Sequence, residues 1–167
     1  LRAGALKKAL ENGKAEEIEA AKKSLDDAGK AFYKNYYNKT DEKVMGALLK
    51  LYHDDIDKTY HPAFFAMIAK KYKGDFSKYA ADLFKKSIFA DEARFNSFIA
   101  NPSLKALSAD AAFTGAEAII AVNRQLAEKL QATSQVIERS NRLFLKGLME
   151  MQNNRTFYPD ANFTMRL

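Results

Sequence analysis

Hydrophobic residues recur every three or four positions along most of this chain, and glycine, proline or polar residues interrupt the pattern at intervals. This period matches the turn of an α-helix, so each stretch predicts a helix with one apolar face. The pattern predicts an all-α fold, a multi-helix bundle with one long C-terminal helix and a short extended tail. The predicted helices are one that ends at Asn12 and Gly13, one over residues 15–36, one that begins at Thr40, and those over residues 62–72, 76–87, 92–101 and 111–152.

Residues that favour helix ends mark several of these boundaries. Thr40, Asp75 and Asp91 each precede a periodic stretch. We expect them to cap the helices that follow, because their side-chain oxygens can accept free backbone N–H groups. Pro62 suits the first position of a helix, where no N–H is needed. Gly74 is expected to end that helix, since glycine readily adopts the left-handed conformation of a C-terminal cap.

The apolar faces of these helices supply the expected core. The face of the second helix, which needs a packing partner, comprises Ile18, Ala21, Leu25, Ala28 and Phe32. The expected core face of the third helix comprises Val44, Leu48, Leu51 and Tyr52. The aromatic residues of the shorter helices, which we interpret as core packing and not as a ligand site, are Phe64, Phe65, Phe76, Tyr79, Phe84, Phe89, Phe95 and Phe98.

The last predicted helix differs from the others in length. No proline interrupts residues 111–152, although Gly115 and Gly147 lie within them. At ~1.5 Å per residue such a helix is roughly 60 Å long, which favours a role as a spine or arm. Its heptad-like apolar stripe comprises Ile119, Val122, Leu126, Leu130, Thr133, Ile137, Ser140, Phe144, Leu148 and Met151.

The chain ends on FYPDANFTMRL, where the period changes from helical to alternating. Phe163, Met165 and Leu167 alternate with polar residues, as in a half-buried strand. A lone strand has no partner for its backbone hydrogen bonds. We therefore expect Phe157 and Tyr158 to pack on the helices, and the residues from Asp160 onward to be mobile or to pair with another molecule.

Composition narrows the class of protein. The 167 residues are 47% hydrophobic and 29% charged, enough for one domain with its own core. There is no cysteine, which excludes disulfides and thiolate metal sites. The chain begins at Leu1 and shows no signal peptide and no membrane-spanning run, so we expect a soluble interior piece of a longer protein.

The net charge of +6 and the pI of about 9.3 raise the alternative of an anionic partner such as nucleic acid. The lysines, however, are interleaved with acids, as in KKALENGKAEEIEAAKKSLDDAGK. Pairs such as Glu19 and Lys23 then stabilise a solvated helix surface. This distribution predicts no nucleic-acid partner.

Candidate chemistry is confined to HDDIDKTYH. On one helix face His53, Asp57 and His61 would offer nitrogen and oxygen ligands to a metal. Pro62 biases His61 away from the helical conformation, so the three are not expected to share a face. We interpret them as surface histidines and a solvated acidic turn, and we predict no metal and no cofactor. No serine-hydrolase elbow, phosphate loop or calcium loop occurs in the sequence.

Much of the sequence nevertheless resembles a known family. The segment YHPAFFAMIAKKYKGDFSKYAADLFKKSIFADEARFNSFIANPS and the later RLFLKGLMEMQNNRTFYPDANFTMRL are similar to the helical domain of bacterial serine dipeptidyl-peptidases, which remove dipeptides from the N-termini of oligopeptides. The resemblance runs from about Lys14 to the end of the chain. KYKGDF, SIFADE and FYPDANFTMRL are its most specific parts.

The resemblance implies a helical domain inserted into a chymotrypsin-like double β-barrel that carries the catalytic residues. Residues 1–156 would be part of the helical cap, and residues 157–167 the return towards the barrel. It implies that no catalytic residue lies in this chain, that the substrate-binding residues are unknown, and that the fragment is inactive alone. The implied partners are the barrel of the same parent and an oligopeptide, with no nucleic acid and no membrane. The parent would be periplasmic or associated with the surface of a Gram-negative cell, and a homodimeric parent is compatible with the resemblance.

Two functional hypotheses follow from different classes. The first is the substrate-gating cap of a serine dipeptidyl-peptidase, which closes the cleft and excludes water. The second is a free-standing basic helical module that binds nucleic acid or a protein through its long helix. Flanking sequence would distinguish them, because the first requires barrel segments on both sides. The residue preference at the cleavage site and the oligomeric state do not follow from the sequence.

Overall fold

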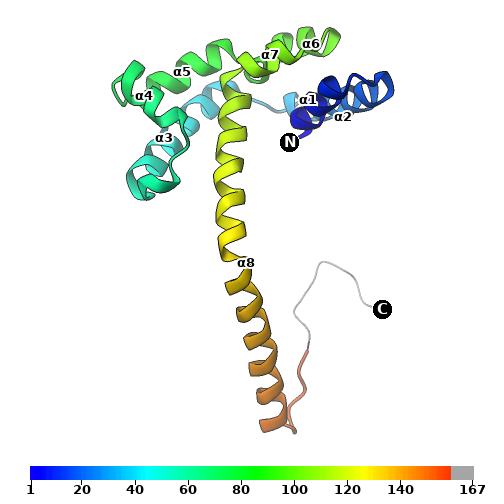
Figure 1. Ribbon diagram of the computed structural model, residues 1–167, viewed down its shortest axis with the longest axis vertical. Coiled ribbons are helices and arrows are strands. Elements are labelled where there is room, and N and C mark those ends of the chain that lie inside the picture. The colour runs from blue at the N-terminus through cyan, green and yellow to red at the C-terminus, as the bar shows by residue number, and fades with distance from the viewer. Residues whose placement is uncertain (159–167) are drawn as a thin grey trace. The chain divides into compact units, whose positions relative to one another are not determined.

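The structure is a computed structural model, and it describes residues 1–158 (Figure 1). These residues are all-α and contain no β-strand, which confirms the predicted fold class. They form two compact units, one over Leu1–Asn123 and one from Arg124 onward. The elements are α1 (Arg2–Asn12), α2 (Ala15–Tyr33), α3 (Asn38–Asp55), the 3-10 turn η1 (Lys58–Tyr60), α4 (Phe64–Tyr72), α5 (Phe76–Lys86), the 3-10 turn η2 (Ile88–Ala90), α6 (Glu92–Ala100), α7 (Leu104–Ala109) and α8 (Ala111–Met151).

Several predicted helix ends are confirmed by their cap geometry. Gly13 ends α1 in the left-handed conformation, with φ 70°. The carboxylate of Asp75 accepts the Lys78 N–H at 2.9 Å, and that of Asp91 accepts the Arg94 N–H at 3.0 Å. Each acidic side chain therefore satisfies a donor that the first helical turn leaves free.

Other boundaries lie a few residues from the prediction. The second helix ends at Tyr33 and not near residue 36. The third begins earlier, with Tyr37 as the capping residue in an extended conformation, so Thr40 lies inside the first turn and its predicted capping role is wrong. Pro62 precedes α4 by two residues, because its carbonyl accepts the Phe65 N–H in a turn that leads into the helix.

The first core lies where α1, α2 and α6 pack together. Leu6 and Leu107 are fully buried, and the Phe95 ring fills the centre at 2% exposure. Gly29 of α2 allows a very close approach, since a Cβ atom at this position would lie 2.2 Å from the Phe95 ring. The other buried members of this core are Ala3, Leu25, Phe98, Ile99 and Phe113.

The second core lies between α3, α4 and α5. Ile68 is fully buried there, and the two helices α3 and α5 pack closely because Gly46 presents no side chain. A Cβ atom at Gly46 would lie 3.1 Å from the backbone of Ser77. The other buried members are Leu49, Phe65, Phe76, Tyr79 and Leu83.

The predicted core face of α3 is wrong for three of its four residues. Val44, Leu48 and Leu51 are 45%, 57% and 56% exposed, and only Tyr52 packs against the second core. The helix instead turns Gly46 and Leu49 towards α5. The close approach at Gly46 decides this rotation, because a small residue brings two helix backbones together where Val44 could not. The predicted face of α2 also reaches solvent at one end, with Phe32 51% exposed.

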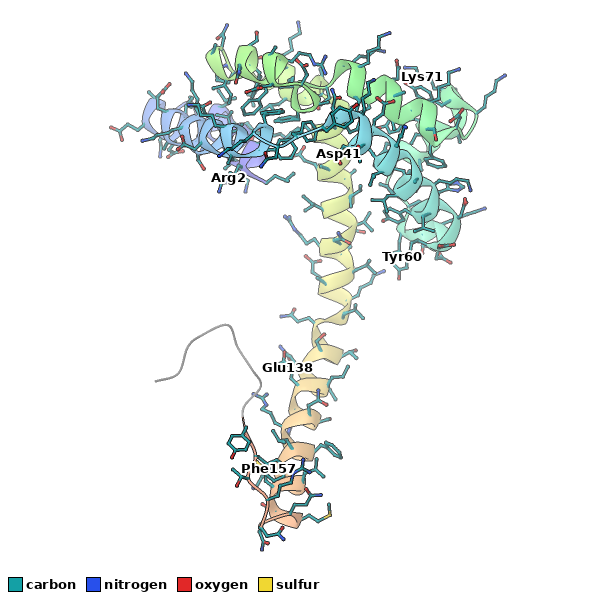
Figure 2. The ribbon with its side chains drawn as sticks, turned by 180° about the vertical axis from the view of Figure 1, so that it is seen from behind. Arg2, Asp41, Tyr60, Lys71, Glu138 and Phe157 are labelled. Carbon is teal, nitrogen blue, oxygen red and sulfur yellow. The ribbon has the colours of Figure 1, made fainter. Side chains whose placement is uncertain are left out.

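The long predicted helix over residues 111–152 is confirmed as α8. In the unit from Arg124 onward, a turn follows Met151, with the Arg155 N–H donating to the Gln152 carbonyl. Figure 2 shows the chain returning so that Phe157 lies beside the last turns of α8, and Phe157 is half-buried as predicted. Tyr158 is 85% exposed, which contradicts its predicted packing. The predicted strand at residues 162–167, and the mobility or pairing expected from Asp160 onward, lie outside the described residues.

Candidate functional site

A buried carboxylate organises the junction of α5, η2 and α8. Asp110 is 6% exposed, and its carboxylate accepts four hydrogen bonds. The Ser87 hydroxyl donates at 3.1 Å and the Ile88 N–H at 2.7 Å. The N–H groups of Ala112 and Phe113 donate at 3.0 and 2.9 Å, so Asp110 also caps α8. A buried charge is tolerated in this way only when hydrogen bonds satisfy it.

Arg94 of α6 also binds to this junction, through two hydrogen bonds from its guanidinium. Its Nε donates to the Ser87 carbonyl and its Nη2 to the Phe84 carbonyl, both at 2.8 Å. The Phe84 carbonyl has no helical partner, because the Ile88 N–H donates to Asp110, and the Ser87 carbonyl also accepts the Ala90 N–H at 3.5 Å. The guanidinium therefore ties the C-terminal end of α5 to α6.

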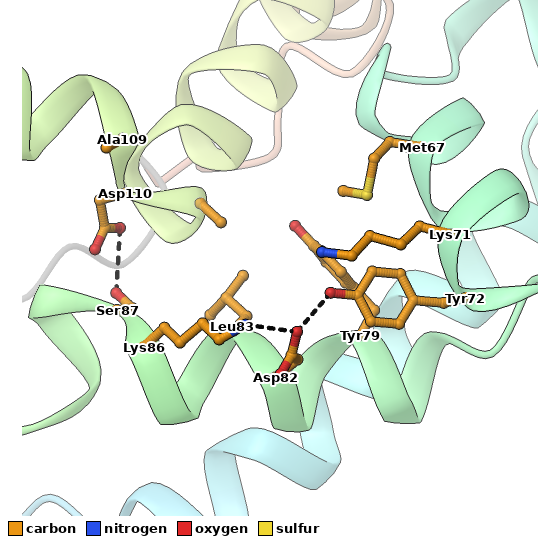
Figure 3. Close-up of a pocket in the computed structure, with 11 residues that line it drawn as sticks. Met67, Lys71, Tyr72, Tyr79, Asp82, Leu83, Lys86, Ser87, Ala109 and Asp110 are labelled. Atoms are coloured by element: carbon orange, nitrogen blue, oxygen red, sulfur yellow. Dashed lines mark hydrogen bonds and ion pairs between the residues drawn. The ribbon is translucent and has the colours of Figure 1, made fainter.

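A pocket of about 180 Å³ opens beside this junction, between α4, α5 and the start of α8 (Figure 3). Its polar wall centres on Asp82, whose Oδ2 accepts the Tyr72 hydroxyl at 2.7 Å and the Lys86 ammonium at 3.0 Å. In Figure 3 the Tyr79 hydroxyl and the Lys71 ammonium turn towards the same space.

The charges of this wall are coupled to one another. The hydrogen bond from Tyr72 and then that from Lys86 lower the pKa of Asp82. The same contact with Asp82 raises the pKa of Lys86. Burial, followed by the nearby Tyr72 and Asp110, raises the pKa of Tyr79. These directions favour an ionised Asp82, a protonated Lys86 and a protonated Tyr79 at neutral pH.

The three residues considered as metal ligands are only partly brought together. The rings of His53 and His61 lie 5.1 Å apart, centre to centre, and both pack on Phe65. His61 has an extended backbone, as predicted from Pro62, and its Nε2 contacts the Ile56 carbonyl at 2.8 Å. Asp57 instead caps η1 by accepting the Thr59 N–H.

These contacts give each of the three residues a structural partner. His53 is exposed and contacts Asp54 through Nδ1 at 3.0 Å, whereas His61 is half-buried and is not the surface residue we predicted. Within residues 1–158, no group of three or more histidine and acidic side chains has an arrangement that could hold a metal ion. Neither histidine has a serine among its hydrogen-bond partners in this part of the chain.

Sequence reasoning missed both Asp110 and the pocket. Asp110 directly precedes an apolar periodic stretch, so the same signal that identified Asp75 and Asp91 was present. The pairing of Asp82 with Lys86 has the spacing of a helical ion pair. The contribution of Tyr79 has no sequence signal, because the residue lies within an ordinary aromatic core pattern.

Two apolar faces are left without a partner among the described residues. The outer face of α3 carries Val44, Leu48 and Leu51. In the second unit, α8 exposes an even larger set, namely Leu130, Val136, Ile137, Leu143, Phe144, Leu145, Met149 and Met151. In both places several exposed apolar residues lie close together along one helix, whereas single exposed apolar residues are normal on a protein surface. None of the helices in residues 1–158 has the length and apolar character needed to cross a bilayer.

Comparison with known proteins identifies the relatives of this chain. It is 32% identical over 166 residues to dipeptidyl-peptidase 7 of Phocaeicola vulgatus, which covers 97% of the chain and 23% of that protein. It is 36% identical over 150 residues to dipeptidyl-peptidase 7 of Porphyromonas gingivalis, covering 87% of the chain and 20% of that protein. The Asp/Glu-specific dipeptidyl-peptidase of the same organism is 32% identical over 133 residues, covering 80% and 18%. The chain thus spans about a fifth of the length of these relatives. The Peptidase S46 family model matches residues 2–167, and the chain belongs to this family.

Proposed function

We propose that this chain is a helical cap domain of a serine-type dipeptidyl-peptidase, that it gates access of oligopeptides to a separate catalytic domain, and that it is inactive alone. Membership of the Peptidase S46 family and the names of its relatives support the peptidase part of the proposal. The periplasmic or cell-surface location in a Gram-negative bacterium, and the absence of nucleic-acid and membrane partners, belong to the same proposal.

The observation that carries the cap role is the unpartnered apolar surface. Leu48 and Leu51 of α3 are more than half exposed, although they form a regular stripe with Val44. Burying a leucine side chain contributes roughly 1.5–3 kcal/mol, so such a stripe favours contact with another protein surface. In a chain that spans about a fifth of its relatives, the rest of the polypeptide is the natural partner.

The distal part of α8 favours a globular partner over a second copy of the same helix. Leu143, Phe144 and Leu145 are consecutive and at least half exposed. Consecutive residues lie about 100° apart around a helix, so these three cover about 200°. A two-stranded coiled coil buries a much narrower seam. A broad apolar arc of this kind suits a surface that surrounds the helix on more than one side.

Activity measurements test the proposal directly. The isolated 167-residue chain should release no fluorophore from dipeptidyl-coumarin substrates and should not react with a fluorophosphonate probe. The protein encoded by the complete gene should do both, and its flanking sequence should encode the barrel segments. Turnover by the isolated chain, together with labelling of one of its serines, would contradict the proposal. A complete gene that ends with this chain would favour the free-standing helical module.

A matched pair of variants tests the α3 surface. In the complete protein, Leu48→Gln should lower the activity or the thermal midpoint, because it places an amide in the apolar contact. The control is Lys50→Gln, because Lys50 lies on the same helix but away from the stripe, and this variant should have little effect on either quantity. Equal behaviour of the two variants in the complete protein would show that the stripe of α3 is not a contact surface.

A further inference from the structure

We infer that the pocket between α4, α5 and the start of α8 is a binding site for a single carboxylate group. The pocket is lined entirely by residues within 67–111, in one compact unit. The inference therefore does not depend on the proposed cap function.

The first observation is a buried phenol without a partner. Tyr79 is 4% exposed, yet its hydroxyl has no hydrogen-bond partner among the described residues, and it lines the pocket. Buried tyrosine hydroxyls are normally hydrogen-bonded. Every fully enclosed side-chain nitrogen or oxygen atom in residues 1–158 has a hydrogen-bond partner. Because the Tyr79 hydroxyl has none, it is not fully enclosed and instead opens into the pocket. Figure 3 shows it directed there. It offers one O–H donor to a ligand.

The second observation is the excess of donors at the mouth. Lys71 has no carboxylate within ion-pair distance among the described residues, and its ammonium lies over the Tyr72 ring, 5.2 Å from the centroid. Lys86 uses one of its three protons on Asp82. Together with Tyr79, these two lysines offer several N–H and O–H groups to a ligand.

Most acceptors in the same wall are already occupied. Asp110 accepts four hydrogen bonds, and Oδ2 of Asp82 accepts two. The carbonyls of Tyr72 and Leu83, at the ends of α4 and α5, accept the N–H groups of Asp75 and Ser87. The remaining hydrogen-bonding capacity is therefore mainly that of donors, which favours an anion over an ammonium group.

Charge and size select a carboxylate among the anions. Lys86 balances Asp82, and the helix start at Ala112 and Phe113 balances Asp110. Of the two lysines that line the pocket, Lys71 is the one without an ion-pair partner in residues 1–158. A monoanion matches this charge, whereas a phosphate dianion would add repulsion from the two aspartates. The volume of about 180 Å³ is below the roughly 300–1,000 Å³ of drug-sized sites. This volume suits the carboxylate end of a ligand.

Amide chemical-shift titration of the ¹⁵N-labelled 167-residue chain tests the inference. The probes are sodium acetate, acetyl-glycylglycine and acetyl-glutamate amide, which represent a free acid, a peptide C-terminus and an acidic side chain. We expect saturable shifts at Tyr79 and Leu83 with at least one of them. The probe that binds most tightly identifies the source of the carboxylate.

Three variants locate the binding. Tyr79→Phe keeps the ring that stacks on Phe64 and removes only the hydroxyl, and Lys71→Met keeps the aliphatic stem. Each should weaken binding about tenfold, the equivalent of one hydrogen bond to a charged group. Lys70→Met makes the same change of charge one residue away and should bind like the unchanged chain. Circular dichroism confirms that each variant is folded, and Lys71→Met, at an exposed position, tests the site even if Tyr79→Phe does not fold.

Three results would overturn the inference. The first is the lack of saturable shifts with all three carboxylates, which would mean that the pocket holds only water. The second is binding that survives both Tyr79→Phe and Lys71→Met. The third is tighter binding of methylammonium or inorganic phosphate than of any carboxylate, which would show that the charge preference is misassigned.

Discussion

Replacing Asp110 with alanine should destabilise the chain more than the loss of any exposed helix cap. The substitution removes the cap of α8 and leaves the Ile88 N–H and the Ser87 hydroxyl without their acceptor. Loss of a cap costs about 1 kcal/mol. A buried donor without an acceptor costs about 1–3 kcal/mol, although the Ser87 hydroxyl can rotate. We therefore expect the free energy of unfolding to fall by roughly 2–4 kcal/mol.

Urea unfolding followed by circular dichroism measures this loss of stability. Two further variants separate the contribution of the helix cap from that of the contacts with Ser87 and Ile88. Asp75→Ala removes only an exposed cap, the one that accepts the Lys78 N–H, and should cost about 1 kcal/mol. Asp110→Ser can still cap α8 but is too short to reach Ile88, so its cost should lie between the other two. If Asp110→Ala costs no more than Asp75→Ala, the buried network contributes nothing beyond the cap, and the reasoning is refuted.

Two further predictions concern packing and pH. Gly29→Ala should destabilise the first core by about 1–3 kcal/mol despite the better helix propensity, because its Cβ would overlap the Phe95 ring. Gly115→Ala, whose Cβ would lie 3.8 Å from Phe64, should be neutral or stabilising in the same urea titration, and equal effects of the two would refute the packing argument. Burial raises the pKa values of Tyr33 and Tyr36 to about 12, so absorbance at ~295 nm should show late-titrating phenols in the folded chain. The folded state disfavours their ionised forms, so this contribution to stability should be complete below pH ~10 and lost as the pH rises towards ~12. Tyr33→Phe should reduce the late-titrating absorbance, and titration of all tyrosines near pH ~10 in the folded chain would contradict the assignment.

The existence of every α-helix except α7 followed from local signals, whereas α7 (Leu104–Ala109) was not predicted from the sequence. Periodicity and caps predicted α1, α5, α6 and the whole of α8 to within a residue or two at most ends. Such signals are local because helical hydrogen bonds and caps join residues only a few positions apart. The errors at Thr40 and Pro62 arose because the two helices begin at other residues than the local signals indicated, α3 at Asn38 and α4 at Phe64. The segments that resemble dipeptidyl-peptidases likewise identified the family from the sequence.

The tertiary structure alone decided which faces are buried and which side chains meet. On α3 two apolar faces compete, and the close contact of Gly46 with Ser77 buries the one with Leu49 and exposes the one with Leu48. Periodicity cannot rank two apolar faces, because the ranking depends on the shape of the helix that packs against them. The contacts of Asp110 with Ile88 and Ser87 span 22 and 23 positions, and the pocket joins three helices, so neither has a local pattern. Local hydrogen bonding determined where this chain is helical, whereas long-range packing decided where it is buried and where it can bind.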